Sequence, residues 1–348
     1  MKKGVLVCFG ASERKNIGDY VQSLAARQFA GSDAVNIERE SLQDYVGGPT
    51  KLVMNGWFMH HPTRFPPADD IRPLFVSFHV RPKIENRFFT EATVAYLRAH
   101  APIGCRSTDA VEMMRRHGIE AEFSSCLTLT LGETYRHVES DSPPLFVDPF
   151  FLRFATRWWR TSAPLRILLR LPFILRHFRV VRHLASRFRV FRFWPGIRFA
   201  AVRWYYASEF LRAYSPVFSE DVLMSAAFVT HHVAKRDYPT EAALFSHADE
   251  LLRRYERAPY VVTSRLHCAL PCLAMGTPAW VPYHPDMTTG RFGGNDAFMN
   301  VLTFGEDGRL KPLPGGRIRP GDVPPVRTDH RPYADALARR CRTFMEGE

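Results

Sequence analysis

A serine, an arginine and a histidine stand together where an apolar run typical of a strand gives way to a helix-like stretch. The run is Thr263-Ser264-Arg265-Leu266-His267. The N-terminus of a helix carries unpaired N–H groups and a partial positive charge, so it attracts phosphate or carboxylate. Arginine adds a planar two-pronged donor, and histidine exchanges a proton near neutral pH. This block could therefore bind an anion and protonate a group attached to it. The alternative is that Ser264 caps the helix and that Arg265 and His267 are only exposed.

Polar side chains stand at the ends of several other strand-like runs. In open α/β sheets, ligands bind beyond the carboxyl ends of the strands, so side chains at these positions tend to meet. We therefore expect a cleft between two domains, lined by both. For any one of these residues a structural role is the alternative. They are Asp19, Asn55, His79, Arg106, His231 and His232.

Strand-like and helix-like patterns alternate along most of the chain, which favours an α/β fold with mostly parallel sheets. The expected strands are Val5–Phe9, Leu52–Met54, Leu74–Val80, Ile103–Cys105, Phe123–Leu131, Tyr260–Thr263 and Pro278–Val281, with a further apolar run at Val222–Val229. The expected helices are Asp19–Phe29, Glu91–Ala99, Thr108–His117, Thr240–Arg257, Leu266–Met275 and Tyr333–Phe344. We predict an N-terminal α/β domain at 1–150, a C-terminal one at 213–330 and a last helix within 331–348.

The segment 151–212 between these domains carries most of the positive charge. It holds fourteen arginines, no lysine and one acid, Glu209, so it contributes +13 to a net charge of +12 and leaves −1 for the rest. Trp158, Trp159, Trp194 and Trp204 lie among these arginines, and Pro172 should interrupt its helices. The composition suits a helical insert on an anionic membrane surface. The alternative is that the helices of this segment pack on the protein. Binding of nucleic acid is not expected, because no nucleic-acid-binding module accompanies the segment.

The remaining features favour a cytoplasmic protein, peripheral at most on the inner face of the cytoplasmic membrane. The six cysteines show no disulfide framework, and no metal-ligand spacing stands out. The apolar run Val5–Phe9 is too short for the core of a signal peptide. No uninterrupted apolar stretch reaches about 18 residues, so we expect no membrane span.

The chain resembles the polysaccharide pyruvyl transferases over roughly residues 4–135 and 220–295. The resemblance lies in Asn16-Ile17-Gly18-Asp19-Tyr20, Pro102-Ile103-Gly104-Cys105-Arg106, Ser125-Cys126-Leu127-Thr128-Leu129-Thr130, Thr263-Ser264-Arg265-Leu266-His267 and Gly276-Thr277-Pro278. Many members have Asp where this chain has Ser107, and the segment 151–212 matches no part of the family.

This resemblance implies two Rossmann-like domains like those of the GT-B glycosyltransferases, with the active site in the cleft between them. It implies phosphoenolpyruvate as the donor, no further cofactor and a cyclic pyruvate ketal as the product. His267 would be the general acid, and Arg265 and Arg106 would bind the donor beside Ser264. Asp19, His79, His231 and His232 are candidates for acceptor binding or for the base.

The expected reaction is transfer of a pyruvyl group to a sugar of a surface polysaccharide or of its lipid-linked precursor. Two alternatives from other classes remain. One is a sugar-nucleotide glycosyltransferase of the same fold, which a nucleotide diphosphate would stabilise on heating. The other is a membrane- or nucleic-acid-binding protein acting through 151–212, for which Arg265 and His267 would be dispensable.

Overall fold

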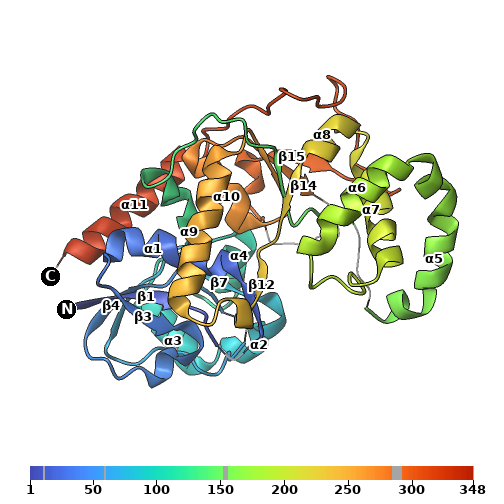
Figure 1. Cartoon of the computed structure of the whole chain (residues 1–348). Helices are drawn as coiled ribbons and strands as arrows, with labels where there is room; N and C mark the ends of the chain where they lie inside the picture. Colours follow the sequence, from blue (N-terminus) through green and yellow to red (C-terminus); the bar gives the residue numbers. More distant parts are fainter. Residues whose placement is uncertain (11, 59, 152–155, 284–291, 348) are drawn as a thin grey trace.

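The first half of the chain folds around a four-stranded parallel sheet (Figure 1). The computed structural model describes residues 1–10, 12–58, 60–151, 156–283 and 292–347. The strand order is β3 (Val35–Glu38), β1 (Lys2–Val7), β4 (Thr50–Val53) and β6 (Ile71–Leu74). Helix α1 (Ile17–Ala30) packs on β1, and its first turn is capped by Asn16, whose side chain accepts from the Gly18 N–H. The sheet thus places the start of α1 near the carboxyl end of its central strands.

The expected strand at Leu74–Val80 is two strands. β6 ends at Leu74, and β7 (His79–Val80) pairs in parallel with β5 (Trp57–Phe58). The chain turns at Ser77, which has a φ of 57°, so that Phe78 can pair with Cys105 instead of continuing β6. Cys105 ends β8 (Ile103–Cys105), which pairs with β9 (Ala121–Phe123). The run Leu74–Val80 therefore forms two strands, because its first part pairs with β4 and its last part with β5.

The helices of this half follow their predicted positions closely. Besides α1, they are α3 (Glu91–Ala99) and α4 (Thr108–Arg116). The short helix α2 (Glu85–Phe88) and the 3-10 turns η1 (Arg39–Asp44) and η2 (Pro82–Ile84) were not predicted. The prediction of a strand over Phe123–Leu131 was wrong beyond Phe123. The chain turns at Ser125, which has a φ of 62°, and then forms the 3-10 helix η3 (Leu127–Glu133). η3 packs against α1, α10 and α11, so its leucines and threonines from Leu127 to Leu131 are buried much as those of a strand would be.

The second half is built on a five-stranded parallel sheet in the order β11 (Ala227–Val229), β10 (Leu145–Val147), β13 (Val261–Thr263), β14 (Ala279–Tyr283) and β15 (Asn300–Thr303). β10 pairs with β11 and β13, so the predicted boundary at residue 150 was wrong and this strand belongs to the second domain. The apolar run at Val222–Val229 divides into α8 (Glu220–Ser225), capped by Ser219, and β11.

Helices cover both faces of this second sheet. Leu145, Val147 and Val261 join a core with α1, α9 (Glu241–Arg257) and α10 (Leu266–Met275). Phe146 and Val262 join a separate core with α6 (Phe178–Arg187) and α7 (Ala200–Tyr214). Two shorter pieces, η5 (Lys235–Asp237) and η6 (Asp296–Phe298), lie in connecting loops.

Much of the arginine-rich segment therefore packs on the protein. α6, η4 (Phe188–Val190) and α7 bury their apolar residues in the second core, and Trp194 and Trp204 pack against that core. Helix α5 (Thr156–Arg176) runs through Pro172 without a break, so the prediction of an interruption there was wrong. The side chains of Trp158 and Trp159 lie outside the described part of the structure. None of the helices in the described residues has the length and hydropathy needed to cross a membrane.

The two halves are joined at several places. β2 (Arg14–Asn16) of the first half pairs antiparallel with β12 (His232–Ala234) of the second. The last helix, α11 (Arg331–Glu346), returns to pack on α1, β4 and η3 of the first half (Figure 1). The predicted α/β class with parallel sheets is confirmed. The likeness to GT-B glycosyltransferases stays a prediction.

Candidate functional site

The junction between β13 and α10 is held by hydroxyl groups. The Thr263 hydroxyl donates to the Val147 carbonyl at 3.0 Å and accepts from the Arg265 N–H at 3.0 Å. The Ser264 hydroxyl accepts from the Phe150 N–H at 3.0 Å and donates to the Pro282 carbonyl at 3.4 Å. Arg265, not Ser264, occupies the N-cap position of α10, so the alternative of Ser264 as helix cap was wrong. Donor binding by Ser264 stays a prediction.

Arg265 is held in place by an aspartate that the sequence analysis did not identify. Its Nε donates to Asp148 Oδ2 at 2.9 Å, and its Nη2 donates to His232 Nε2 at 2.5 Å. The same Asp148 oxygen accepts from the His231 N–H at 3.0 Å. Asp148 has a φ of 43°, a costly conformation for a residue other than glycine. The end of β10 is thus bent to aim a carboxylate at Arg265.

The protonation states of Asp148 and His232 depend on burial and on their charged neighbours. Burial alone would raise the pKa of Asp148, but Arg265 and the two neighbouring histidines lower it to about 2. Burial and the adjacent Arg265 lower the pKa of His232 to about 3. Asp148 is therefore a carboxylate and His232 a neutral ring at pH 7, which matches the observed donation from Arg265 to both.

His267 and His231 meet the first half of the molecule at a glycine. A methyl group on Gly18 would lie 3.1 Å from His267 Nδ1 and 3.3 Å from His231 Nδ1. The His231 carbonyl accepts from the Ile17 N–H at 2.8 Å. The Nε2 of the His231 ring lies 2.8 Å from the Tyr255 hydroxyl. Both rings thus lie against the first turn of α1, where a larger residue would displace them.

Arg106 follows β8 and is a buried cation. It is 3% exposed, and its guanidinium lies 5.7 Å from the centre of the Trp57 ring. Among the described residues it forms no ion pair, and its Nε has no hydrogen-bond partner. Burial lowers its pKa. Because an uncompensated buried charge is costly, this arrangement favours an anionic ligand.

Two further contacts surround Arg106. His79 is buried beside it, 3.4 Å from the Ser107 hydroxyl, and burial and Arg106 hold its pKa well below the ordinary value. The Arg106 carbonyl accepts from Asn295 Nδ2 at 2.9 Å, and Asn295 Oδ1 accepts from the Ser125 hydroxyl at 2.6 Å. Asn295 comes from the second half of the chain and is fully buried. Asn295 therefore links the second domain to Arg106, the candidate donor-binding residue of the first domain.

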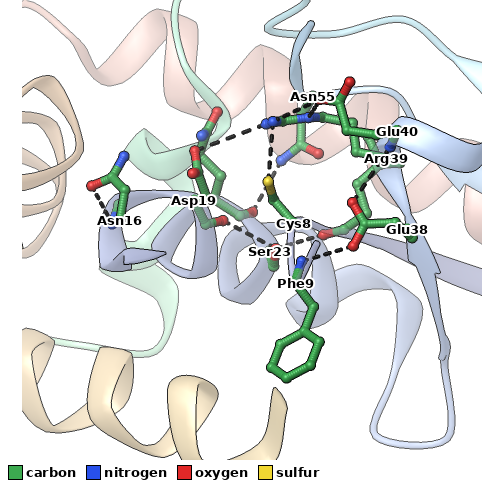
Figure 2. Close-up of polar contacts among 12 residues, drawn as sticks. Cys8, Phe9, Asn16, Asp19, Ser23, Glu38, Arg39, Glu40 and Asn55 are labelled. Carbon is green, nitrogen blue, oxygen red and sulfur yellow. Dashed lines mark hydrogen bonds and ion pairs between the residues drawn. The ribbon is translucent and has the colours of Figure 1, made fainter. Parts of the chain in front are cut away.

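Asp19 lies in the first turn of α1 beside a second buried arginine, as Figure 2 shows. Arg39 Nη1 is 3.9 Å from Asp19 Oδ1, and Arg39 also contacts Glu40 at 3.0 Å and Cys8 Sγ at 3.2 Å. Burial raises the pKa of Asp19, and the charges of Arg39 and Arg106 oppose that rise. Asn55 lines the same small pocket as Asp19 and Arg39 and donates to the Gln22 carbonyl. The first turn of α1 thus directs Gly18 toward the histidines and Asp19 toward the arginines.

The structure therefore brings the predicted residues into two adjoining groups at the meeting of the two halves. Arg265, His267, His231 and His232 form one, and Arg106, His79 and Asp19 the other. The sequence analysis missed Asp148, Asn295, Tyr255 and Arg39. The arrangement offers a histidine, two arginines suited to anions and a carboxylate, which are the groups that transfer of an anionic unit requires.

One protein family matches most of the chain. The family model for polysaccharide pyruvyl transferase matches residues 16–281, which include every predicted site residue. The chain belongs to the polysaccharide pyruvyl transferase family, and the predicted family is confirmed. Neither the curated proteins nor the solved structures yielded a match to the chain. The family defines a transferase, and the details of its reaction follow as a proposal.

Proposed function

We propose that this protein transfers the pyruvyl carbons of phosphoenolpyruvate onto two hydroxyls of one sugar, in a surface polysaccharide or its lipid-linked precursor. The donor methylene takes a proton, and a sugar hydroxyl oxygen bonds to C2. The C2–O bond to phosphate then breaks, and the second hydroxyl closes the ketal. Of the two hydroxyl protons, one replaces the proton given to the methylene and the other leaves with phosphate. The products are a pyruvate ketal and inorganic phosphate.

The observation that carries this proposal is the position of the first turn of α1, where Gly18 lies against His267 and Asp19 lies near Arg106. We assign His267 as the proton donor, because its ring lies against the first turn of α1 and a histidine exchanges a proton near neutral pH. Arg265 and Arg106 bind the carboxylate and phosphate of the donor. Arg106 supports this role, since its buried guanidinium forms no ion pair with a described residue and its Nε has no hydrogen-bond partner there.

Asp19 is the favoured base among the four candidates. A proton acceptor works best when its pKa lies near the working pH, and burial moves the pKa of Asp19 upward. The pKa values of His79 and His232 are lowered, so both rings are weak bases. His232 is also occupied by Arg265. We assign His232 to holding Arg265 and His231 to packing against Gly18.

The test is incubation with phosphoenolpyruvate and synthetic or lipid-linked glycans, followed by phosphate release and product mass. We expect turnover in the wild type and a loss of at least about a hundredfold in His267→Gln. Arg106→Lys keeps the charge but loses the planar fork, so it should raise the KM for phosphoenolpyruvate. His117→Gln, whose ring stacks on Phe89 outside the site, is the matched control. Turnover of a nucleotide sugar in place of phosphoenolpyruvate would refute the proposal.

A further inference from the structure

Exposed leucine and phenylalanine side chains are concentrated in one part of the molecule. Elsewhere in the described residues, the large apolar side chains that reach solvent are valines and Met1. Every exposed Leu or Phe of that set lies between residues 165 and 199, with exposed fractions from 43% to 72%. They are Leu165, Leu168, Leu169, Leu171, Leu175, Phe178 and Phe199. A surface that faces only water rarely gathers so many large apolar side chains in one place.

The five leucines share one face of α5. At about 100° per residue, positions 165, 168, 169, 171 and 175 fall within one half of the helix circumference. Ile167, Phe173 and Ile174 fall on the opposite half and pack on the core formed with α6 and α7. Helix α5 lies at the outer edge of the molecule, on the far side from the sheet of the first domain (Figure 1). The leucine face therefore points away from the rest of the protein.

Two arginines of this helix, Arg166 and Arg170, are turned toward α7. Arg170 forms an ion pair with Glu209 of α7, and Glu209 also receives Arg212 at 3.3 Å. Arg166 Nη1 lies 3.5 Å from the Tyr205 hydroxyl. The outer face of an ordinary surface helix is mostly polar, whereas that of α5 carries five exposed leucines beside Arg176. The arrangement of α5 suits a helix whose outer face meets an apolar environment.

Exposed arginines without an ion-pair partner among the described residues follow the leucines along the chain. Glu209, the sole acid of residues 151–212, is buried and already paired with Arg170 and Arg212. The exposed arginines that form no ion pair with any described residue are Arg176, Arg179, Arg182, Arg187, Arg189 and Arg198. The leucines and these arginines follow one another along α5, α6 and the loop after it. An anionic layer with an apolar interior complements both groups.

We propose that α5 lies in the interface of an anionic lipid bilayer, with its leucines among the acyl chains and the arginines of α6 at the phosphate groups. A second copy of the chain would bring two equally cationic surfaces together, which opposes self-association through this face. Nucleic acid would pair with the arginines but leave the leucines in water. Trp194 and Trp204 take no part, because they pack on the core of the second domain.

The test is sedimentation with vesicles of phosphatidylcholine alone and of phosphatidylcholine with phosphatidylglycerol, without substrates. We expect the wild type to sediment with the anionic vesicles at low salt and to be released as salt rises, because the cationic part of the attraction is screened. We expect little binding to the neutral vesicles. The assay needs no turnover, so its result is independent of the proposed reaction.

The decisive variant combines Leu168→Gln, Leu169→Gln and Leu175→Gln, at positions between 63% and 72% exposed. It should weaken binding to anionic vesicles by at least about tenfold. The matched control combines Val46→Gln, Val323→Gln and Val326→Gln, which alters three exposed apolar residues away from α5 and should bind like the wild type. Thermal unfolding of both variants checks that they fold.

Three outcomes would overturn the proposal. The first is a wild type that stays in the supernatant with anionic vesicles at low salt. The second is a leucine variant that folds and binds as well as the wild type, which would mean that the arginines alone account for binding to the vesicles. The third is a wild-type dimer in analytical ultracentrifugation that the leucine variant, but not the control, dissociates.

Discussion

Replacing Asp148 with asparagine tests the ion pair on which the candidate site is built. The side chain is 6% exposed and binds Arg265 at 2.9 Å. Its pKa falls from the ordinary value of 3.8 to about 2. At about 1.4 kcal/mol for each pH unit, this difference corresponds to about 2 kcal/mol of folding free energy. We therefore expect Asp148→Asn to lower the free energy of unfolding at pH 7 by about 2 kcal/mol.

The pH dependence of this loss has a definite sign. Because the pKa is lower in the folded protein, the carboxylate stabilises the fold fully above the unfolded value near 3.8. The stabilisation disappears as the pH falls toward 2. The difference between wild type and Asp148→Asn should thus be equal at pH 7 and pH 5 and shrink only below about pH 4.

Urea unfolding followed by tryptophan fluorescence measures both effects. The matched control is Asp237→Asn, which removes an ion pair between Asp237 and Arg192 whose side chains are 35% and 53% exposed. Exposed pairs of this kind contribute at most about 1 kcal/mol. A loss in Asp148→Asn no larger than in the control would refute our account of the pair. A difference that changes between pH 7 and pH 5 would assign the effect to another titrating group.

Two further predictions concern the contacts between the two halves. Gly18→Ala should lower kcat by at least about tenfold with little change in overall fold, because the added methyl lies 3.1 Å from His267 Nδ1. Kinetics with phosphoenolpyruvate and circular dichroism test this prediction, and a variant with wild-type kinetics would contradict it. Asn295→Ala leaves the Ser125 hydroxyl and the Arg106 carbonyl without their partner, so it should cost about 1–3 kcal/mol of stability and raise the KM for phosphoenolpyruvate. An unchanged KM in a destabilised Asn295→Ala would limit this residue to a structural role.

Local sequence signals predicted the elements that carry Arg265 and His267. Helix α10 spans the predicted residues 266–275, and Gly276 ends it with a left-handed φ of 83°. The alternation of apolar runs likewise predicted the α/β class, because buried parallel strands are apolar on both faces. The same rule misassigned η3, because the leucines of its Leu127–Leu131 stretch are buried in a 3-10 helix just as they would be in a strand.

The partners of the site residues were harder to predict. Asp148 pairs with a residue 117 positions away and follows a strand of three residues, which the sequence analysis did not recognise. Had β10 been recognised, the rule about polar residues after strands would have pointed to Asp148. Asn295 lies in a loop without a periodic pattern, so no local signal marks it. Residues 151–212 were ambiguous because both buried helices and membrane-surface helices are rich in aromatic residues and leucine.

The path of the chain between the domains has a mechanical consequence. The chain enters the second domain between η3 and β10, and it returns to the first between β15 and α11. These two covalent connections add to the core that α1 shares with α9 and α10, which already holds the domains together. The first domain is also completed by the last residues of the chain. A chain cut before Arg331 would uncover apolar surface on the first domain, where Leu337, Cys341 and Met345 of α11 are buried.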